Sequence, residues 1–205
     1  MPDATLRWRE SDGIAVLTVC APPRNEMTLA FFRALADLRR EVFPRLAVRG
    51  VVVHGEGRHF SSGADLAELR AILAARSDEA EALLRDNHLS FQALESLPFP
   101  VVAAIGGCCL GAGLELALAC HARIAAPRAV FALPEVSFGL MPGCGGTVRL
   151  PRLVGPSKAA ELILSGRTFL ADEAREIGLV DRIVDRKDLV AAAREFILRG
   201  PGEAR

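Results

Sequence analysis

The feature that most constrains the fold is Val101–Cys120, where an apolar run, a glycine-rich turn and a second apolar segment follow one another. Residues 101–105 are apolar and partly β-branched, which predicts a buried strand. Glycines at 106, 107, 111 and 113 interrupt the run and allow close backbone approach. From Ala112 the chain is apolar on almost every side, which predicts a buried helix. This strand–turn–helix unit would direct free N–H groups and the positive end of the helix dipole at one point.

A second unit of the same kind precedes it. A buried strand is predicted at 50–54, followed by a glycine-containing loop, the small residues 61–64 and a helix near Asp65 to Arg76. If the amides of Ala64 and Ala112 converge on one oxygen, they would stabilise an oxyanion by about 3 kcal/mol per donor. The alternative is two tight turns with no shared target, because glycine-rich turns are common.

The remaining segments alternate between strand and helix patterns, which favours one α/β domain spanning residues 1–205 with a core of about 6–190. Strands are predicted at 6–10 and 14–19 around an Asp-Gly turn, at 122–126, 129–133 and 179–184. Helices are predicted at 28–42 with Thr28 as a possible N-cap, at 78–97, from about 145, and at 156–165, 171–177 and 187–198.

Composition excludes several classes of protein. The 205 residues are 51% hydrophobic and 24% charged with a formal net charge of +0, so we expect neither disorder, nor a nucleic-acid partner, nor an anionic membrane surface. The first residues have no apolar leader segment, and no apolar run is long enough to span a bilayer. Five cysteines without a C-x-x-C pair, and four histidines without metal spacing, predict no disulfide framework and no metal site. We therefore expect a reduced, cytoplasmic protein.

Glu115 is the first candidate for chemistry. It lies one turn into the predicted buried helix, and LELALAC offers it no partner at helical spacing. Burial of an unpartnered carboxyl raises its pKa, which suits proton transfer near neutral pH. The alternative is a carboxylate that reaches solvent or forms a structural ion pair with an arginine.

Glu135 is the second candidate, at the end of a predicted strand. The helix after Ala112 carries the chain roughly 13 Å away at ~1.5 Å per residue. Two short strands at ~3.3 Å per residue can bring it back, so Glu135 could face Glu115 across one pocket. The alternative is an exposed loop acid.

Other motifs are absent or weak. The glycines at 106–113 do not fit G-x-G-x-x-G, and the chain has neither a P-loop nor a G-x-S-x-G turn. Arg24, Arg58 and Arg149 could hold phosphate, although solvation at the surface is the default for each.

Four blocks resemble the crotonase superfamily, the enoyl-CoA hydratases and isomerases: FSSGADLAEL at 60–69 and the segments 106–126, 131–155 and 171–184. The similarity runs in order from about Leu6 to Val190. It implies an α/β spiral of ββα units with two near-perpendicular sheets flanked by helices. It also implies an acyl-CoA thioester substrate, with coenzyme A entering as part of the substrate and no separate cofactor, and assembly into trimers or hexamers.

The resemblance also implies roles for individual residues. Ala64 and Ala112 match the two oxyanion-hole amides, and Glu115 and Glu135 match the two glutamates of the hydratases. These acids would hold a water that adds across the C2–C3 double bond. Isomerases often keep only the second glutamate, so having both favours hydration. The residues expected to contact substrate or coenzyme A are Arg24, Ser62, Gly63, Asp65, Leu66, Gly111 and Gly145.

The chain departs from the family pattern in three places. The basic residue that often follows the GAD motif is replaced by Ala67-Glu68, which leaves Arg24 as the substitute for a phosphate contact. The family asparagine after the second strand is matched to Met27, and the usual C-terminal helices, which cover the acyl pocket and contact a neighbouring subunit, are missing. We therefore expect a short member and a weakened homo-oligomer. The alternatives are a Δ3-Δ2 enoyl-CoA isomerase, a non-catalytic homologue that binds acyl-CoA or a partner, and a specialised biosynthetic hydratase.

Overall fold

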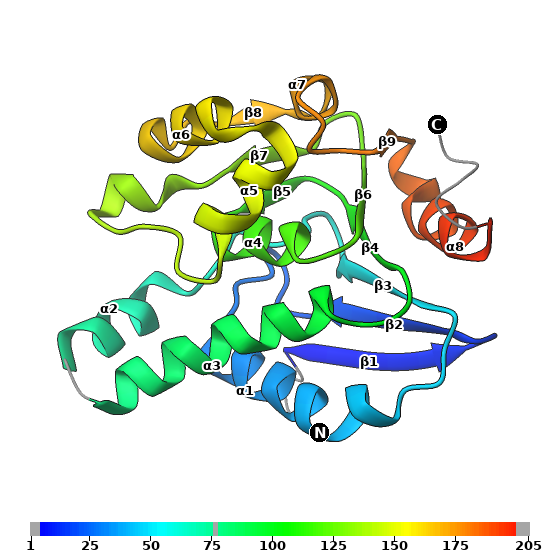
Figure 1. Ribbon diagram of the computed structural model, residues 1–205, viewed down its shortest axis with the longest axis horizontal. Helices are drawn as coiled ribbons and strands as arrows, with labels where there is room; N and C mark the ends of the chain where they lie inside the picture. Colours follow the sequence, from blue (N-terminus) through cyan, green and yellow to red (C-terminus); the bar gives the residue numbers. More distant parts are fainter. Residues whose placement is uncertain (1–4, 76–77, 200–205) are drawn as a thin grey trace.

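The larger of two β-sheets has six strands in the order β1-β2-β3-β4-β6-β9 (Figure 1). The computed structural model describes residues 5–75 and 78–199. β1 and β2 form the hairpin predicted around Asp12-Gly13, and every other pair in this sheet is parallel. Its strands are β1 (Leu6–Ser11), β2 (Ile14–Val19), β3 (Gly50–Gly55), β4 (Val101–Ile105), β6 (Ala122–Ala125) and β9 (Arg182–Ile183).

The smaller sheet has the order β5-β7-β8, with β5 (Cys108–Leu110) parallel to β7 (Val130–Ala132) and β8 (Phe169–Leu170) antiparallel to β7. The chain alternates between the sheets, since β4 and β6 belong to the larger one and β5 and β7 follow them in the smaller one. Two sheets built from repeated units and flanked by helices confirm the expected fold class.

Eight α-helices surround the sheets within the described residues. The Thr28 hydroxyl accepts a hydrogen bond from the Phe31 N–H, which confirms the predicted N-cap. The predicted helix 28–42 is regular only to Asp37 and continues as π-helix to Val42. The helices are α1 (Leu29–Asp37), α2 (Leu66–Ala75), α3 (Asp78–Glu95), α4 (Ala112–Leu118), α5 (Gly146–Val154), α6 (Pro156–Ser165), α7 (Ala171–Glu176) and α8 (Leu189–Arg199).

Apolar side chains form two clusters of buried residues. In the smaller cluster, Ile14, Val52 and Ile124 of the large sheet pack with Leu189 and Ile197 of α8. The larger cluster contains residues of both sheets and of α1, α3 and α4, and α4 is buried along its whole length. Burying a helix on all sides explains why its sequence is apolar all round. No helix of the described residues is both long and apolar enough to cross a membrane.

Strand β5 corrects the prediction of a single glycine turn between the strand at 101 and the helix at 112. Cys108–Leu110 pairs with β7 and belongs to the second sheet. Three residues are too few for periodicity to reveal a strand, and each pairing partner lies 22 residues later in the chain. Similarly, the predicted extended segment 179–184 contributes only Arg182–Ile183 to a strand.

Candidate active site

A cavity of about 330 Å³ is lined by residues of α2 and α3, of the start of α4, and of the segment that runs from β7 to α5. Both candidate acids and both candidate oxyanion amides line it. Four of the residues expected to contact the substrate also line it: Ser62, Gly63, Leu66 and Gly111. Leu110, the neighbour of Gly111, lines it as well.

Backbone hydrogen bonds hold the two glycine-rich turns against each other. The Ser61 N–H donates to the Cys108 carbonyl, and the Leu110 N–H donates to the Ser61 carbonyl, both at 3.0 Å. The approach is so close that a Cβ on Gly63 would lie 2.8 Å from the Leu110 oxygen and 3.4 Å from the Ala112 nitrogen. The turn carrying Ala64 and the helix start carrying Ala112 therefore lie side by side.

Within residues 5–75 and 78–199, the backbone N–H groups of Ala64 and Ala112 remain free. The flanking amides are occupied, since Gly63 donates to the Ser61 hydroxyl and Asp65 to the Met27 carbonyl. Among the described residues, no acceptor is found for the N–H of either alanine. Two neighbouring residues that line one cavity and whose N–H groups have no acceptor among the described residues can bind one oxygen atom, if both donors point at it, as in an oxyanion hole.

Glu115 is only 2% exposed and is held by two backbone donors. Its Oε1 accepts hydrogen bonds of 2.8 Å from the N–H groups of Cys144 and Gly146. The expectation of an unpartnered carboxyl was therefore wrong, because its partners come from a turn thirty residues later. Burial raises the pKa of Glu115 to about 7. The hydrogen bond from Gly146 lowers this pKa, and the charge of Glu135 raises it further.

Glu135 is the second residue of the short 3-10 helix Pro134–Phe138 and lines the same cavity. Its Oε2 is buried and has no hydrogen-bond partner among the described residues. Burial raises the pKa of this carboxyl, while its own backbone N–H lowers it. A Cβ on Gly111 would lie only 3.1 Å from Oε1 of Glu135, and Gly111 has a positive φ of 52°. Both the close contact and the backbone conformation favour glycine at this position.

Arg149 was expected at the surface, and that expectation was wrong. Its side chain is 5% exposed, its Nε donates to Glu95 at 2.8 Å, and its Nη1 donates to the Cys144 carbonyl at 2.6 Å. Arg149 thus fixes the turn that donates to Glu115, and its charge lowers the pKa of that acid. This role could not be predicted from the sequence, because the sequence does not show that a carboxylate, here that of Glu95, will pair with Arg149 in the interior.

Three residues expected to contact substrate or coenzyme A do not line the cavity. Arg24 is exposed and pairs with Glu26 at 2.9 Å. The Asp65 carboxylate accepts from the N–H groups two and three residues later, so it caps the start of α2. Gly145 packs against Arg149 and His88, and its neighbours Gly143 and Cys144 line the cavity instead.

Asn25 was missed by sequence reasoning. It is fully buried, and its amide accepts from the Ala21 N–H and donates to the carbonyls of Glu56 and His59. Its own carbonyl accepts from the Ser61 hydroxyl at 2.7 Å. The buried asparagine of this segment is therefore at position 25 and not at Met27. The sequence signal was an asparagine in a proline-rich turn. Asparagine tolerates positive φ better than most residues, and Asn25 has a φ of 53°.

Most of the remaining lining of the cavity is apolar. It consists of side chains from α1, α2, α3 and the loop after Glu135, with the buried Asn87 as a polar member. An apolar recess beside two free amides and two acids suits a thioester with a hydrocarbon chain. These side chains are Phe32, Leu66, Leu69, Leu84, Phe138, Leu140 and Met141.

Residues 9–199 match the model of a family described as enoyl-CoA hydratase/isomerase. The chain belongs to this family. The chain is 43% identical over 202 residues to the fatty acid oxidation complex subunit alpha of Shewanella halifaxensis. This match covers 96% of the present chain and 28% of the Shewanella protein. The chain is 42% identical over 167 residues to a Bacillus subtilis protein named "Probable enoyl-CoA hydratase", covering 82% of this chain and 64% of that one. The chain thus spans less than two thirds of either relative.

Solved structures share the fold. One from Thermobifida fusca, in complex with acetoacetyl-CoA, has a TM-score of 0.87 and 33% identity. The match covers 96% of this chain and 80% of that one. At this level of identity and coverage, the structural match supports the family assignment independently of the sequence blocks.

Proposed function

We propose that this chain adds water across the C2–C3 double bond of a 2-enoyl-CoA thioester, or removes it in the reverse direction. The observation that carries the proposal is the placement of Glu115 and Glu135 on one cavity with the free N–H groups of Ala64 and Ala112. The family to which the chain belongs supports an acyl-CoA substrate. The acetoacetyl-CoA complex of a structural neighbour supports it as well.

The two amides would polarise the substrate. The thioester carbonyl oxygen would accept hydrogen bonds from Ala64 and Ala112, which draws electrons from the double bond and makes C3 electrophilic. When the water oxygen bonds to C3, negative charge moves through C2 onto this oxygen, where fixed donors stabilise it most. The enolate then collapses as C2 takes a proton.

The surroundings of the acids suggest how they divide the proton transfers. Burial raises the pKa of Glu115 to about 7, but its two N–H bonds favour the anion, so we assign it, at and above neutral pH, as the base that takes a proton from water. Glu135 has a buried oxygen with no partner among the described residues, which favours its protonated form. We therefore assign Glu135 as the acid that supplies the C2 proton.

Coenzyme A would enter only as part of the substrate, and no other cofactor has a role in this scheme. Assembly into a trimer or hexamer and a cytoplasmic location stay predictions. So do the contacts with coenzyme A beyond the thioester, since the cavity lining includes Ser62 and Leu66 but not Arg24.

The direct test is the loss of enoyl-thioester absorbance with crotonyl-CoA and a panel of longer 2-enoyl-CoA substrates. We expect turnover by the wild type and by Glu176→Gln, a matched control whose acid is exposed and lies outside the cavity. Conversion of a 3-enoyl-CoA to the 2-enoyl product without hydration would favour the isomerase instead. Calorimetric binding of acyl-CoA with no turnover of any substrate would favour the non-catalytic homologue.

A further inference from the structure

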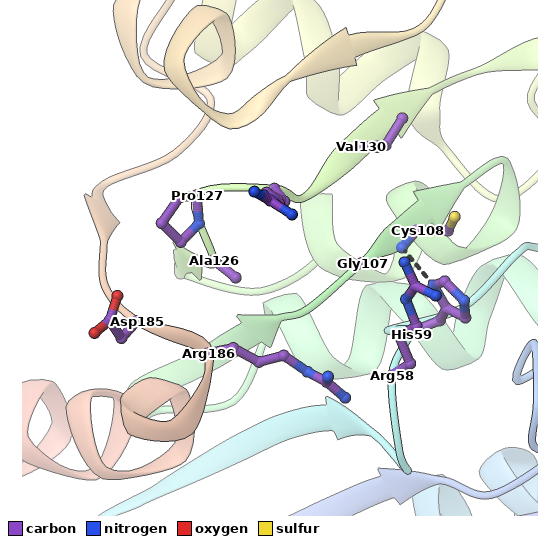
Figure 2. Close-up of a pocket in the computed structure, with 10 residues that line it drawn as sticks. Arg58, His59, Gly107, Cys108, Ala126, Pro127, Val130, Asp185 and Arg186 are labelled. Atoms are coloured by element: carbon purple, nitrogen blue, oxygen red, sulfur yellow. Dashed lines mark hydrogen bonds between the residues drawn. The ribbon is translucent and has the colours of Figure 1, made fainter.

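A second groove, of about 430 Å³, lies at the carboxyl ends of the parallel strands β4 and β6 (Figure 2). Its walls are the loop after β3, the glycine turn after β4, the turn after β6 and the segment after β9. It shares no lining residue with the active-site cavity. The carboxyl ends of parallel strands are a common position for ligand sites in α/β proteins.

Basic side chains from three separate segments converge on this groove. Arg58, Arg128 and Arg186 line it, and Lys187 lines an adjoining hollow that also contains Arg58 and Arg186. In the part of the chain that the structure describes, none of these four forms an ion pair. Most other described arginines do. The acid of the groove lining, Asp185, is exposed.

Hydrogen bonds hold two of the polar side chains of the groove. The Nη2 of Arg186 donates to the Gly57 carbonyl at 2.6 Å, which holds this side chain against the loop after β3. The Cys108 N–H donates to Nδ1 of His59 at 3.0 Å, so the neutral ring carries its proton on Nε2. Burial and the charges of Arg58 and Arg186 lower the pKa of His59 and keep the ring neutral. Figure 2 shows Arg58, His59 and Arg186 gathered at one end of the groove.

The rest of the lining is small or apolar. Gly107, Ala126, Pro127 and Val130 form the surface between the basic groups. A ligand that fits both parts needs concentrated negative charge and a flat apolar portion.

We propose that this groove binds a multiply charged phosphate ligand that carries a flat aromatic ring, such as a nucleoside di- or triphosphate. Guanidinium groups bind phosphate oxygens through paired hydrogen bonds, and several phosphates in a row can contact all of the arginines. Unpaired like charges repel one another, and a bound polyanion relieves that repulsion. The apolar surface between the arginines would contact the base.

Isothermal titration calorimetry with pyrophosphate and with ADP, on the full chain at low ionic strength, tests the proposal. We expect saturable binding that is tighter for ADP than for pyrophosphate and that weakens as salt is added. Arg58→Glu and Arg128→Glu should each weaken binding at least about tenfold, the effect of losing a charge-assisted contact. Arg128→Gln should give a smaller loss in the same direction. Arg45→Glu is the matched control, because Arg45 is exposed, is unpaired among the described residues and lies outside the groove.

Four outcomes would overturn the proposal. They are no saturable binding of either anion, equal losses in Arg45→Glu and Arg128→Glu, and ADP binding that is unchanged in Arg58→Glu and Arg128→Glu but is displaced by saturating acetoacetyl-CoA, which would place the anion in the acyl-CoA site. The fourth is equally tight binding of a polyglutamate peptide, which would make the groove a site for acidic proteins. Thermal unfolding of each variant checks that a loss of binding is not a loss of fold. Hydration activity is measured separately, so that its absence does not affect this result.

Discussion

Glu115 and Glu135 bring the same functional group to one cavity, but the chain holds them in different ways. Glu115 sits in a buried helix and receives two backbone N–H bonds from the turn before α5. Glu135 sits on a short 3-10 turn near the surface, and its buried oxygen has no partner among the described residues. The comparison shows that two carboxyls in one cavity can differ in their hydrogen bonding while burial raises the pKa of both.

The largest effect is expected from Glu115→Gln. Loss of the base should lower kcat for hydration by about 10³–10⁴-fold. The amide oxygen of glutamine can still accept from Cys144 and Gly146, so stability at pH 7 should change little. Stopped-flow absorbance with crotonyl-CoA measures the rate, and denaturant unfolding checks the fold. Hydration at the wild-type rate would remove Glu115 from the mechanism.

Glu135→Gln should lower the same rate by about 10²–10³-fold, because the C2 proton would have to come from solvent. Since the buried oxygen of Glu135 gains nothing from hydrogen bonding in the folded chain, this variant should be as stable as the wild type or more so. Deuterium incorporation at C2, together with thermal unfolding, separates the two effects. Marked destabilisation would mean that Glu135 has a structural role.

The pKa of Glu115 predicts a dependence of stability on pH. The folded-state pKa is about 7 and the ordinary value is 4.5, so the folded state holds the proton more tightly than the unfolded state. The stabilisation is fully present below pH 4.5 and is lost as pH rises through about 7. The loss can reach about 3 kcal/mol. Urea unfolding at several pH values should show this slope in the wild type and not in Glu115→Gln; identical slopes would contradict the assignment.

Arg149→Gln tests whether the frame around Glu115 sets its acidity. The variant removes a charge that lowers the pKa of Glu115 and loosens the turn that donates to it. We expect kcat to fall about tenfold, as for a lost charge-assisted hydrogen bond, and the rising limb of the pH–rate profile to move to higher pH. Arg152→Gln is the control, because Arg152 also pairs with Glu95 but is exposed. A rate loss without a shifted profile would indicate a structural role only.

The smallest effect is expected from Arg24→Gln. Its side chain is exposed, pairs with Glu26 and lies outside the cavity lining, so KM for acyl-CoA should change less than about fivefold, the upper range for a surface ion pair. Steady-state kinetics measure this directly. A much larger rise in KM would place the coenzyme against Arg24, as the family resemblance implies.

The sequence by itself determined the two strand–loop–helix units, the buried helix around Glu115 and the candidate pair of acids. These features leave local signals: β-branched runs, glycines at turns and a helix that is apolar on all sides. Strand β5 and the asparagine at position 25 escaped detection. One is too short for periodicity, and the other acts through hydrogen bonds to residues more than thirty positions away.

Only the tertiary structure decided what surrounds each acid and each arginine. Glu115 obtains its donors from Cys144 and Gly146, and Arg149 enters the interior because Glu95 meets it there. The basic groove likewise depends on three loops that the sheet order brings to one edge. Burial, pKa and pairing depend on groups that are distant in the chain, so no local pattern encodes them.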